Sequence, residues 1–412
     1  MQLLYNVAIG GYLFAIRIAS LFNAKARQWL VGRKGWKEKL TSFATENTPV
    51  AWFHCASLGE FEQGRPILEA FREKYPEFKI LLTFFSPSGY ETRKNYTMAD
   101  IVMYIPADTQ ANVRFFFDLC NLKVVFFVKY DYWFNFIREI NKRNIPFYVI
   151  SAVFRPNQFI FKWYGTWFRN QLSLISGYFV QNDESAVLLK QAGFTNVIVT
   201  GDTRFDRVNE IAQNKIELPV FEQFSHESLV LVAGSTWPAD EAILQQWFAQ
   251  NSHKFKLIVV PHEIDERHLI GLEKRFPKQT IRYSLAKVSG LGNARVLIVD
   301  AIGLLSQLYK FGNIAYIGGG FGKGIHNILE AAVYGKPLLF GPRYKKFREA
   351  TDLATFGGAW PIADAVAFAE TVGLLLSNQE LYETASRICS DYVQKKRGAA
   401  AAILKELESL RL

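Results

Sequence analysis

Short apolar runs alternate with longer amphipathic segments along most of the chain after residue 48. In the first half these runs predict six strands, at Val50–Phe53, Ile80–Phe84, Val124–Val128, Phe147–Ile150, Gly177–Val180 and Val197–Thr200. In the second half they predict five more, at Leu229–Ala233, Lys256–Val260, Val296–Val299, Ile314–Ile317 and Pro337–Phe340. Strands separated by helix-length segments indicate βαβ units and mostly parallel sheets.

A polar stretch separates the two series of strands and indicates two α/β domains. We expect doubly wound, Rossmann-like domains at 41–206 and 228–398, facing each other across a cleft, with a linker at 207–227. Residues 399–412 are rich in Ala, Leu, Glu and Lys, which predicts a C-terminal helix.

The first 40 residues have a different pattern. A mostly apolar run at Leu3–Phe22 contains Arg17 and is followed by six more basic residues, against Glu38 alone, so this segment carries more than half of the net charge of +10. A secretory signal places its charges before the apolar run, whereas here most follow it. Trp29 and Trp36 lie among the basic residues, as is common at membrane interfaces.

These features predict a helix that lies in, or shallowly spans, the inner membrane, with the basic segment on the anionic cytoplasmic face. A buried first helix followed by a solvated basic loop is the alternative. Nucleic-acid binding is a weaker interpretation of the charge, because the chain has no RNP, zinc-finger or helix-turn-helix pattern; we expect no nucleic-acid partner.

Composition excludes several other classes. Half of the 412 residues are hydrophobic and 15% are aromatic, which excludes a disordered chain, and a single near-span-length apolar run excludes a polytopic membrane protein. Three cysteines are too few for a disulfide framework and indicate a reducing compartment. The six histidines lack HExxH-like spacing, and no paired carboxylates end a strand, so we expect neither a metal nor another cofactor.

Ligands of parallel sheets bind beyond the carboxyl ends of the strands, so the segments that follow the strands are the candidate sites. After the first strand comes His54-Cys55-Ala56-Ser57-Leu58-Gly59-Glu60, a strand-to-helix turn. Glu60 is placed in the first helical turn, where it can act as a general base or simply complement the helix dipole.

A glycine-rich segment follows the strand at Ile314–Ile317, with four glycines among residues 318–322. We expect His326 and Asn327 to open a helix whose N-terminus, with the glycines, binds a phosphate, although the spacing fits neither the Walker A nor the dinucleotide pattern. Glu330 is a candidate ribose ligand. The alternatives are a tight loop and a surface carboxylate.

Three further strand ends carry weaker signals that become informative together. They are Ser235-Thr236, His262 and the segment Asp300–Gly303. Ser, Thr and Asp often cap helices, and a lone histidine is often a hydrogen-bonded surface residue. Together these segments are expected to surround one cleft.

The order of these motifs resembles the 3-deoxy-D-manno-octulosonic acid (Kdo) transferases of lipopolysaccharide assembly. His54, Ser57, Gly59 and Glu60 match the family's H-x-x-S-x-G-E element. Five further elements match in order up to about residue 360, at Phe85–Gly89, Ile105–Asp108, Gly201–Asp206, Ala233–Glu241 and Gly324–Glu330.

The sequence departs from the family pattern at several positions. The E-T-E-L-W-P-N element becomes Lys129–Asn135, which replaces the first acid by lysine and keeps the second as Asp131. His262 stands where an arginine near the donor phosphate is expected, and Leu304 replaces an acid. The N-A-R-L-S element becomes Ser151–Arg155.

The resemblance implies a GT-B fold, with the acceptor on the first domain, the nucleotide sugar on the second, and the C-terminal helix crossing back to the first. It implies inverting transfer of Kdo from CMP-Kdo to a lipid A precursor of the lipid IVA type, with Glu60 as the base, CMP stabilised by the glycine-rich helix N-terminus, and no metal. Inner-membrane lipids are expected to contact residues 1–40. A UDP-sugar transferase and a non-catalytic membrane scaffold are the alternatives.

The same resemblance assigns roles to individual residues. The catalytic candidates are Glu60 and Asp131, and the acceptor-binding candidates are Ser57, Gly59, Ser86 and Ser88. The donor-binding candidates are Arg204, Ser235, Thr236, His262, Gly303, Gly319, Gly320, Lys323, His326, Asn327 and Glu330, with Arg343 as a further candidate for charge compensation.

Overall fold

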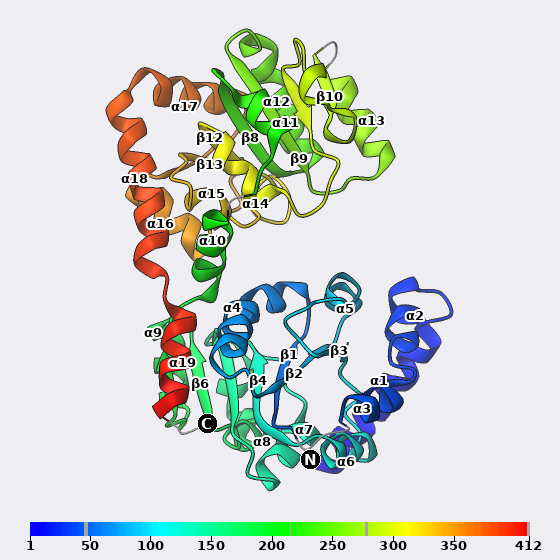
Figure 1. The fold of residues 1–412 in the computed structure, drawn as a ribbon. Coiled ribbons are helices and arrows are strands. Elements are labelled where there is room, and N and C mark those ends of the chain that lie inside the picture. The colour runs from blue at the N-terminus through cyan, green and yellow to red at the C-terminus, as the bar shows by residue number, and fades with distance from the viewer. Residues whose placement is uncertain (45–47, 215, 277–278, 410–412) are drawn as a thin grey trace. The chain divides into compact units, whose positions relative to one another are not determined.

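A computed structural model describes residues 1–44, 48–214, 216–276 and 279–409 (Figure 1). The chain forms two compact units. Unit 1 comprises Met1–Arg207 and Arg397–Leu412, and unit 2 comprises Val208–Lys396.

Unit 1 is built on a seven-stranded parallel sheet of order β3-β2-β1-β4-β5-β6-β7. Its strands are β1 (Val50–Cys55), β2 (Lys79–Phe84), β3 (Ile101–Tyr104), β4 (Leu122–Val128), β5 (Phe147–Ala152), β6 (Gly177–Val180) and β7 (Val197–Val199). Its helices are α1 (Gln2–Ala19), α2 (Ala24–Val31), α3 (Trp36–Phe43), α4 (Leu58–Lys74), α5 (Pro87–Arg93), α6 (Gln110–Leu119), α7 (Phe134–Lys142), α8 (Thr166–Leu172), α9 (Asp183–Gln191) and α19 (Ala399–Ser409).

Helices cover both faces of this sheet, which explains why its strands are almost continuously apolar. On one face Leu40 of α3 and Phe116 of α6 pack with residues of α7, α8 and α9. On the other face Phe61 and Phe71 of α4 pack with Ile403 of α19. The C-terminal helix is therefore part of the core of unit 1.

Unit 2 repeats the architecture with a second seven-stranded parallel sheet, of order β10-β11-β9-β8-β12-β13-β14. Its strands are β8 (Leu229–Thr236), β9 (Phe255–Pro261), β10 (Thr280–Arg282), β11 (Val296–Ile298), β12 (Ile314–Ile317), β13 (Leu338–Phe340) and β14 (Ala359–Pro361). Its helices are α11 (Pro219–Ser225), α12 (Pro238–Asn251), α13 (Glu266–Arg275), α14 (Leu305–Leu308), α15 (Leu329–Ala332), α16 (Arg348–Phe356), α17 (Ala365–Ser377) and α18 (Gln379–Lys396).

All eleven predicted strands are present, with ends that lie within three residues of the predicted ones. The sheets contain three further strands, β3, β10 and β14, and each is an edge strand. The stretch 207–227 was expected as a linker; within it the structure places most of α10 (Thr203–Gln213) and all of α11. Of the predicted C-terminal helix, residues 410–412 lie outside the described residues.

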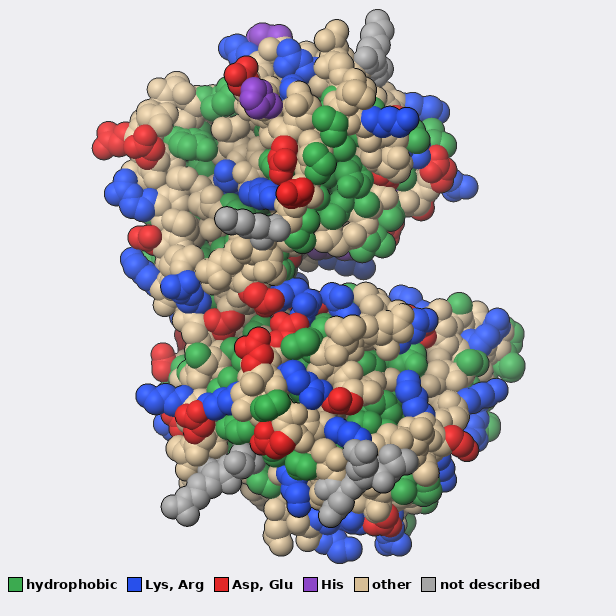
Figure 2. Space-filling model, in the orientation of Figure 1, with side chains coloured by type: hydrophobic (Ala, Val, Ile, Leu, Met, Phe, Trp, Pro, Cys, Tyr) green, Lys and Arg blue, Asp and Glu red, His purple; other side chains and the backbone are tan. Residues whose placement is uncertain are grey.

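Helix α1 is long and apolar enough to cross a membrane, and it is the one such helix among the described residues. It packs on unit 1 through one side: Ile9 is buried, and Gln2, Tyr5, Asn6 and Leu13 are half-buried. Its other side exposes Leu3, Leu4, Val7, Phe14 and Ile18. In Figure 2 hydrophobic and basic side chains lie together over the α1–α2 region of unit 1.

Candidate active site

Glu60 lies in the first turn of α4, directly after the central strand β1. Ser57 is the N-cap of this helix and donates its hydroxyl to the Glu60 carboxylate instead of capping a backbone N–H. The side chain of Glu60 is half-buried, so it stays accessible while Ser57 limits its orientation. This geometry suits a general base at a strand end.

A buried hydrogen-bonded chain leads to the second catalytic candidate, Asp131. The Nε1–H of Trp52 donates to Thr83 Oγ1 at 2.8 Å, Thr83 Oγ1 lies 2.8 Å from His54 Nδ1, and His54 Nε2 lies 2.7 Å from Asp131 Oδ2. Because a carboxylate oxygen only accepts, Nε2 carries the ring proton and Nδ1 accepts from the Thr83 hydroxyl. His54 and Thr83 are fully buried, so they fix Asp131 at the end of β4.

Two stacked aromatic rings, those of Trp133 and Phe85, lie next to Asp131. Trp133 donates its Nε1–H to Asp131 at 3.1 Å and stacks on Phe85 with ring centres 5.0 Å apart. The guanidinium of Arg33 lies 3.5 Å from the ring centre of Trp29. It donates to the carbonyl oxygens of Trp29, Phe85 and Ile105, which connects it to the same aromatic cluster. Burial lowers the pKa of Arg33 to about 9. This arginine therefore supports the strand ends and is not part of a free basic segment.

The four acceptor-binding candidates lie at two neighbouring strand ends. Ser57 and Gly59 follow β1, and Ser86 and Ser88 follow β2, where their hydroxyl oxygens are 2.8 Å apart. Since β2, β1 and β4 are adjacent, the structure brings these residues to the same edge of the sheet as Glu60 and Asp131. Arg204 also belongs to unit 1, where it is paired with Asp202 at 2.7 Å, whereas the other donor-binding candidates belong to unit 2.

In unit 2 the donor-binding candidates follow adjacent strands. Ser235 and Thr236 are the last residues of β8, and Ser235 adopts the left-handed conformation (φ 53°). Asp240 joins this turn to the glycine loop, because its buried carboxylate accepts from the N–H of Trp237 (2.9 Å), the N–H of Gly319 (2.9 Å) and the hydroxyl of Tyr316 (2.6 Å). Burial raises the pKa of Asp240 despite these three donors.

The glycine loop requires glycine for close backbone packing. A Cβ on Gly318 would lie 2.2 Å from the carbonyl oxygen of Ser235, and Gly319 has a φ of 90°. The prediction that His326 and Asn327 open a helix is wrong: α15 begins at Leu329 and has four residues. Gly324, at φ 138°, and an Asn327 side chain that accepts from Leu329 N–H delay the helix. The helix N-terminus that the sequence placed at His326 therefore lies three residues further along, at the start of this short helix.

Three rings form a stack over the turn that follows β8. The ring centre of His262 lies 4.7 Å from that of Trp237 and 4.3 Å from that of His326, with interplanar angles of 28° and 27°. Trp237 donates its Nε1–H to His326 Nε2 at 3.1 Å, so the proton of the neutral His326 ring is on Nδ1. Burial, with a smaller effect of His262, lowers the pKa of His326 to about 4.

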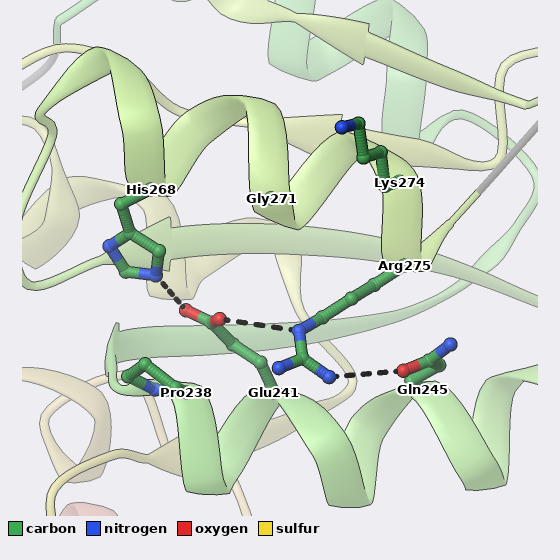
Figure 3. A pocket seen from close by; sticks show the side chains of 7 residues that line it. All are labelled: Pro238, Glu241, Gln245, His268, Gly271, Lys274 and Arg275. Carbon is green, nitrogen blue, oxygen red and sulfur yellow. Dashed lines mark hydrogen bonds and ion pairs between the residues drawn. The ribbon is translucent and has the colours of Figure 1, made fainter.

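Glu241, His268 and Arg275 line a charged pocket between α12 and α13 (Figure 3). Thr236 donates to the buried carboxylate of Glu241 at 3.2 Å, and Glu241 lies 2.9 Å from His268 Nε2 and 4.0 Å from Arg275 Nε. His268 Nδ1 lies 3.0 Å from the carbonyl oxygen of Glu263, which requires a proton on that nitrogen. Burial raises the pKa of Glu241.

The remaining donor-binding candidates surround the same strand ends. Lys323 is exposed at the tip of the glycine loop, and Arg343 donates to the carbonyl oxygen of Gly322 at 2.6 Å. Gly303, at φ 89°, is exposed after β11, and Asn327 donates to Glu330 at 3.0 Å. Gly320 packs against Gly341. Across the described ranges no group of three or more His, Cys, Asp or Glu side chains is arranged to hold a metal ion.

Sequence reasoning missed His54, Trp237 and Asp240 as site residues. Each acts through a partner far away in the chain: His54 through Asp131, Trp237 through His326, and Asp240 through Gly319. His54 lies in the matched element His54–Glu60, and Trp237 and Asp240 lie in the matched element Ala233–Glu241, which was the one signal available for the three residues. The contacts of Trp237 and Asp240 exist only once β8 and β12 are adjacent.

Comparison with known proteins agrees with this geometry. The family model described as 3-deoxy-D-manno-octulosonic-acid transferase (kdotransferase) matches residues 34–207. A 3-deoxy-D-manno-octulosonic acid transferase of Chlamydophila psittaci is 28% identical over 81% of this chain and 78% of its own length. One of Haemophilus influenzae is 25% identical over 87% of this chain and 86% of its own length.

Among solved structures, the UDP-GlcNAc 2-epimerase of Neisseria meningitidis bound to UDP-GlcNAc aligns with a TM-score of 0.62 and 16% identity. The alignment covers 88% of this chain and all of that one. A likeness at this identity concerns the fold alone, and it confirms the expected GT-B class of two Rossmann-like domains. The sequence matches, which extend over most of the chain, make it similar to the Kdo transferases, and these relatives indicate a glycosyltransferase.

Proposed function

We propose that this protein transfers Kdo from CMP-Kdo to a hydroxyl of a lipid A precursor of the lipid IVA type, at the cytoplasmic face of the inner membrane. The observation that carries the proposal is the placement of Glu60, held by Ser57 at the end of the central strand β1, with the His54–Asp131 pair at the end of the adjacent strand β4. Three adjacent strand ends thus supply a base and hydroxyl groups suited to a sugar acceptor.

In the proposed reaction Glu60 accepts the proton of the acceptor hydroxyl. The oxygen then attacks the anomeric carbon of Kdo, while the bond from that carbon to the phosphate oxygen breaks and its electron pair leaves with CMP. Attack opposite the leaving group inverts the anomeric configuration. Asp131, whose carboxylate is oriented by His54 and Trp133, is assigned to position the acceptor.

Unit 2 is proposed to hold the nucleotide. Ser235 and the neutral His326 offer uncharged hydrogen-bond donors near the glycine loop, and Lys323 and Arg343 offer positive charge for the CMP phosphate. Thr236, whose hydroxyl donates to Glu241, is assigned to hold the turn that carries Ser235. The exposed apolar side of α1, followed by basic residues, supports contact with the membrane that contains the acceptor.

The test is transfer from freshly generated CMP-Kdo to a tetraacylated lipid A precursor in detergent, with EDTA present. We expect product from the wild type, and a fall in kcat of about 10²–10⁴-fold for Glu60→Gln with unchanged CMP binding and unchanged Tm. Glu73→Gln is the matched control, because Glu73 is an exposed acid on the same helix.

Three other results would change the assignment of the base, the donor or the metal-free mechanism. Full activity of Glu60→Gln would exclude Glu60 as the base. Absence of product from a folded wild type, with a Tm raised by UDP and not by CMP, would favour a UDP-sugar as the donor. Loss of product on addition of EDTA alone would contradict the metal-free mechanism.

A further inference from the structure

Lys129 introduces a positive charge beside the proposed base. It follows β4 directly, next to the strand that leads to Glu60, at the position where the family pattern has a glutamate. Its backbone is left-handed (φ 66°) and its N–H donates to the carbonyl oxygen of Ile150 at 2.9 Å. A lysine in this conformation is uncommon, because side chains other than Gly, Asn and Asp rarely adopt it.

The helix of Glu60 packs closely on the end of β4. A Cβ on Gly64, four residues after Glu60, would lie 2.7 Å from Val128 Cγ2, so no side chain separates the two elements there. The peptide carbonyl oxygen of Gln63 accepts from Thr203 Oγ1 at 2.6 Å, and Thr203 Oγ1 lies 2.9 Å from Ser151 Oγ. These contacts place the ends of β4 and β5, and the residues that follow β7, next to the first turns of α4.

The charges acting on the Lys129 ammonium are those of Glu60, Asp202, Arg204 and Arg155. Asp202 is already paired with Arg204, and Glu60 accepts from Ser57. Lys129 is half-buried, and its ammonium makes no hydrogen bond or ion pair to any other residue that the structure describes. Burial lowers its pKa accordingly.

A half-buried ammonium without a counterion has three N–H donors for an anion. During transfer the acceptor oxygen must lie about 3 Å from Glu60 and about 3 Å from the anomeric carbon. In an octulosonic acid the carboxylate is bonded directly to that carbon. The carboxylate is therefore the substrate anion that the chemistry brings nearest to Glu60.

We propose that Lys129 binds the carboxylate of the Kdo residue during transfer, beside the hydroxyl that Glu60 deprotonates. This inference rests on the proposed function.

The test compares two donors, CMP-Kdo and its carboxamide analogue, in the wild type, Lys129→Met and Lys129→Arg. We expect the wild type to prefer CMP-Kdo by about 10–100-fold in kcat/KM, as for a lost charge-assisted hydrogen bond. Lys129→Met should lose this preference to within about threefold, and Lys129→Arg should retain most of it. Lys123→Met is the control, since Lys123 is exposed on the same strand.

A full preference for CMP-Kdo in Lys129→Met would overturn the inference while leaving the proposed function intact. A rise in KM for the acceptor alone would also overturn it, and would assign Lys129 to an anion of the acceptor. No transfer from CMP-Kdo by the folded wild type would overturn both. Methionine keeps a flexible unbranched side chain at φ 66°, and a Tm within a few degrees of the wild type would show that the variant folds; the arginine variant provides the second comparison.

Discussion

Single hydrogen bonds determine which ring nitrogen carries the proton in two histidines of the site, His326 and His54. Trp237 donates to His326 Nε2, which leaves the ring's proton on Nδ1 and makes His326 a neutral donor. His54 has the opposite tautomer, because its Nε2–H faces Asp131. His262, which stands where the family pattern has an arginine, belongs here to a stack with Trp237 and His326.

The low pKa of His326 predicts how stability changes with pH. Its pKa is about 4 in the folded protein and near 6.5 when unfolded, so the unfolded chain binds more protons between these values. The stabilisation is complete above pH 6.5 and is lost as pH falls towards 4. For this partly exposed ring we expect a loss on the order of 1 kcal/mol after solvent screening.

Thermal unfolding of wild type and His326→Gln from pH 7 to pH 4 tests this. Glutamine does not titrate and still accepts from Trp237, so the variant's stability should fall less steeply. Equal slopes for the two proteins would mean that His326 titrates normally. His253→Gln, at another histidine of unit 2 and outside the ring stack, should leave the slope unchanged.

At the scale of elements, the polar residues that interrupt the first apolar run attach α1 to unit 1. Tyr5 donates to Asp108 at 2.5 Å, and Asn135 contacts both Gln2 (2.8 Å) and Asn6 (3.0 Å). Asp108 also caps α7, and burial raises its pKa to about 6. Two motif residues, Asp108 and Asn135, thus hold the N-terminal helix instead of a ligand.

Because α1 is attached along one side, we expect its exposed side to bind the membrane surface. Val7 and Phe14 are 65% and 63% exposed, so Val7→Asp with Phe14→Asp should leave the Tm unchanged. Loss of their burial in lipid should lower partitioning onto phosphatidylglycerol-containing vesicles at least tenfold. Co-sedimentation measures this.

The control for the vesicle experiment is Val366→Asp, which changes an equally exposed valine on α17 of unit 2. It should leave partitioning unchanged. Undiminished binding of the double variant would assign membrane contact to another surface, such as the basic residues alone.

Whether a strand could be predicted from the sequence depended on how deeply its residues are buried. Central strands are covered on both faces and read as continuous apolar runs, and all of them were found from the sequence. The missed β10 and β14 are three-residue edge strands: the residues of β10 are half-buried, those of β14 range from buried to exposed, and so short a run gives little pattern. The missed β3 is a four-residue edge strand. Glu60 was identifiable because its motif is local, whereas the helix expected at His326 failed because Gly324 and Asn327 impose a loop.

At the scale of the whole molecule, the chain begins and ends in unit 1. Asp206 accepts from the N–H groups of Gly398 (2.5 Å) and Ala400 (2.9 Å), and so caps α19. Asp206 is the last residue of the Gly201–Asp206 element that resembles the family pattern. Its two contacts with the start of α19 give it a structural role. The helix then buries Ile403 and Leu407 against α4, the helix that carries Glu60.

This arrangement predicts that a change in the last helix destabilises the unit that holds the base. Ile403→Ala should lower the unfolding free energy of unit 1 by about 2–4 kcal/mol, because Ile403 is fully buried. Hydrogen exchange should therefore speed up in α4 and in the central strands of unit 1, while the strands of unit 2 keep their protection. Lys405→Ala, at an exposed position of the same helix, should change neither. If Ile403→Ala loosened both units equally, α19 would stabilise the chain as a whole and not the core of unit 1, and the link between the C-terminal helix and Glu60 would have to be abandoned.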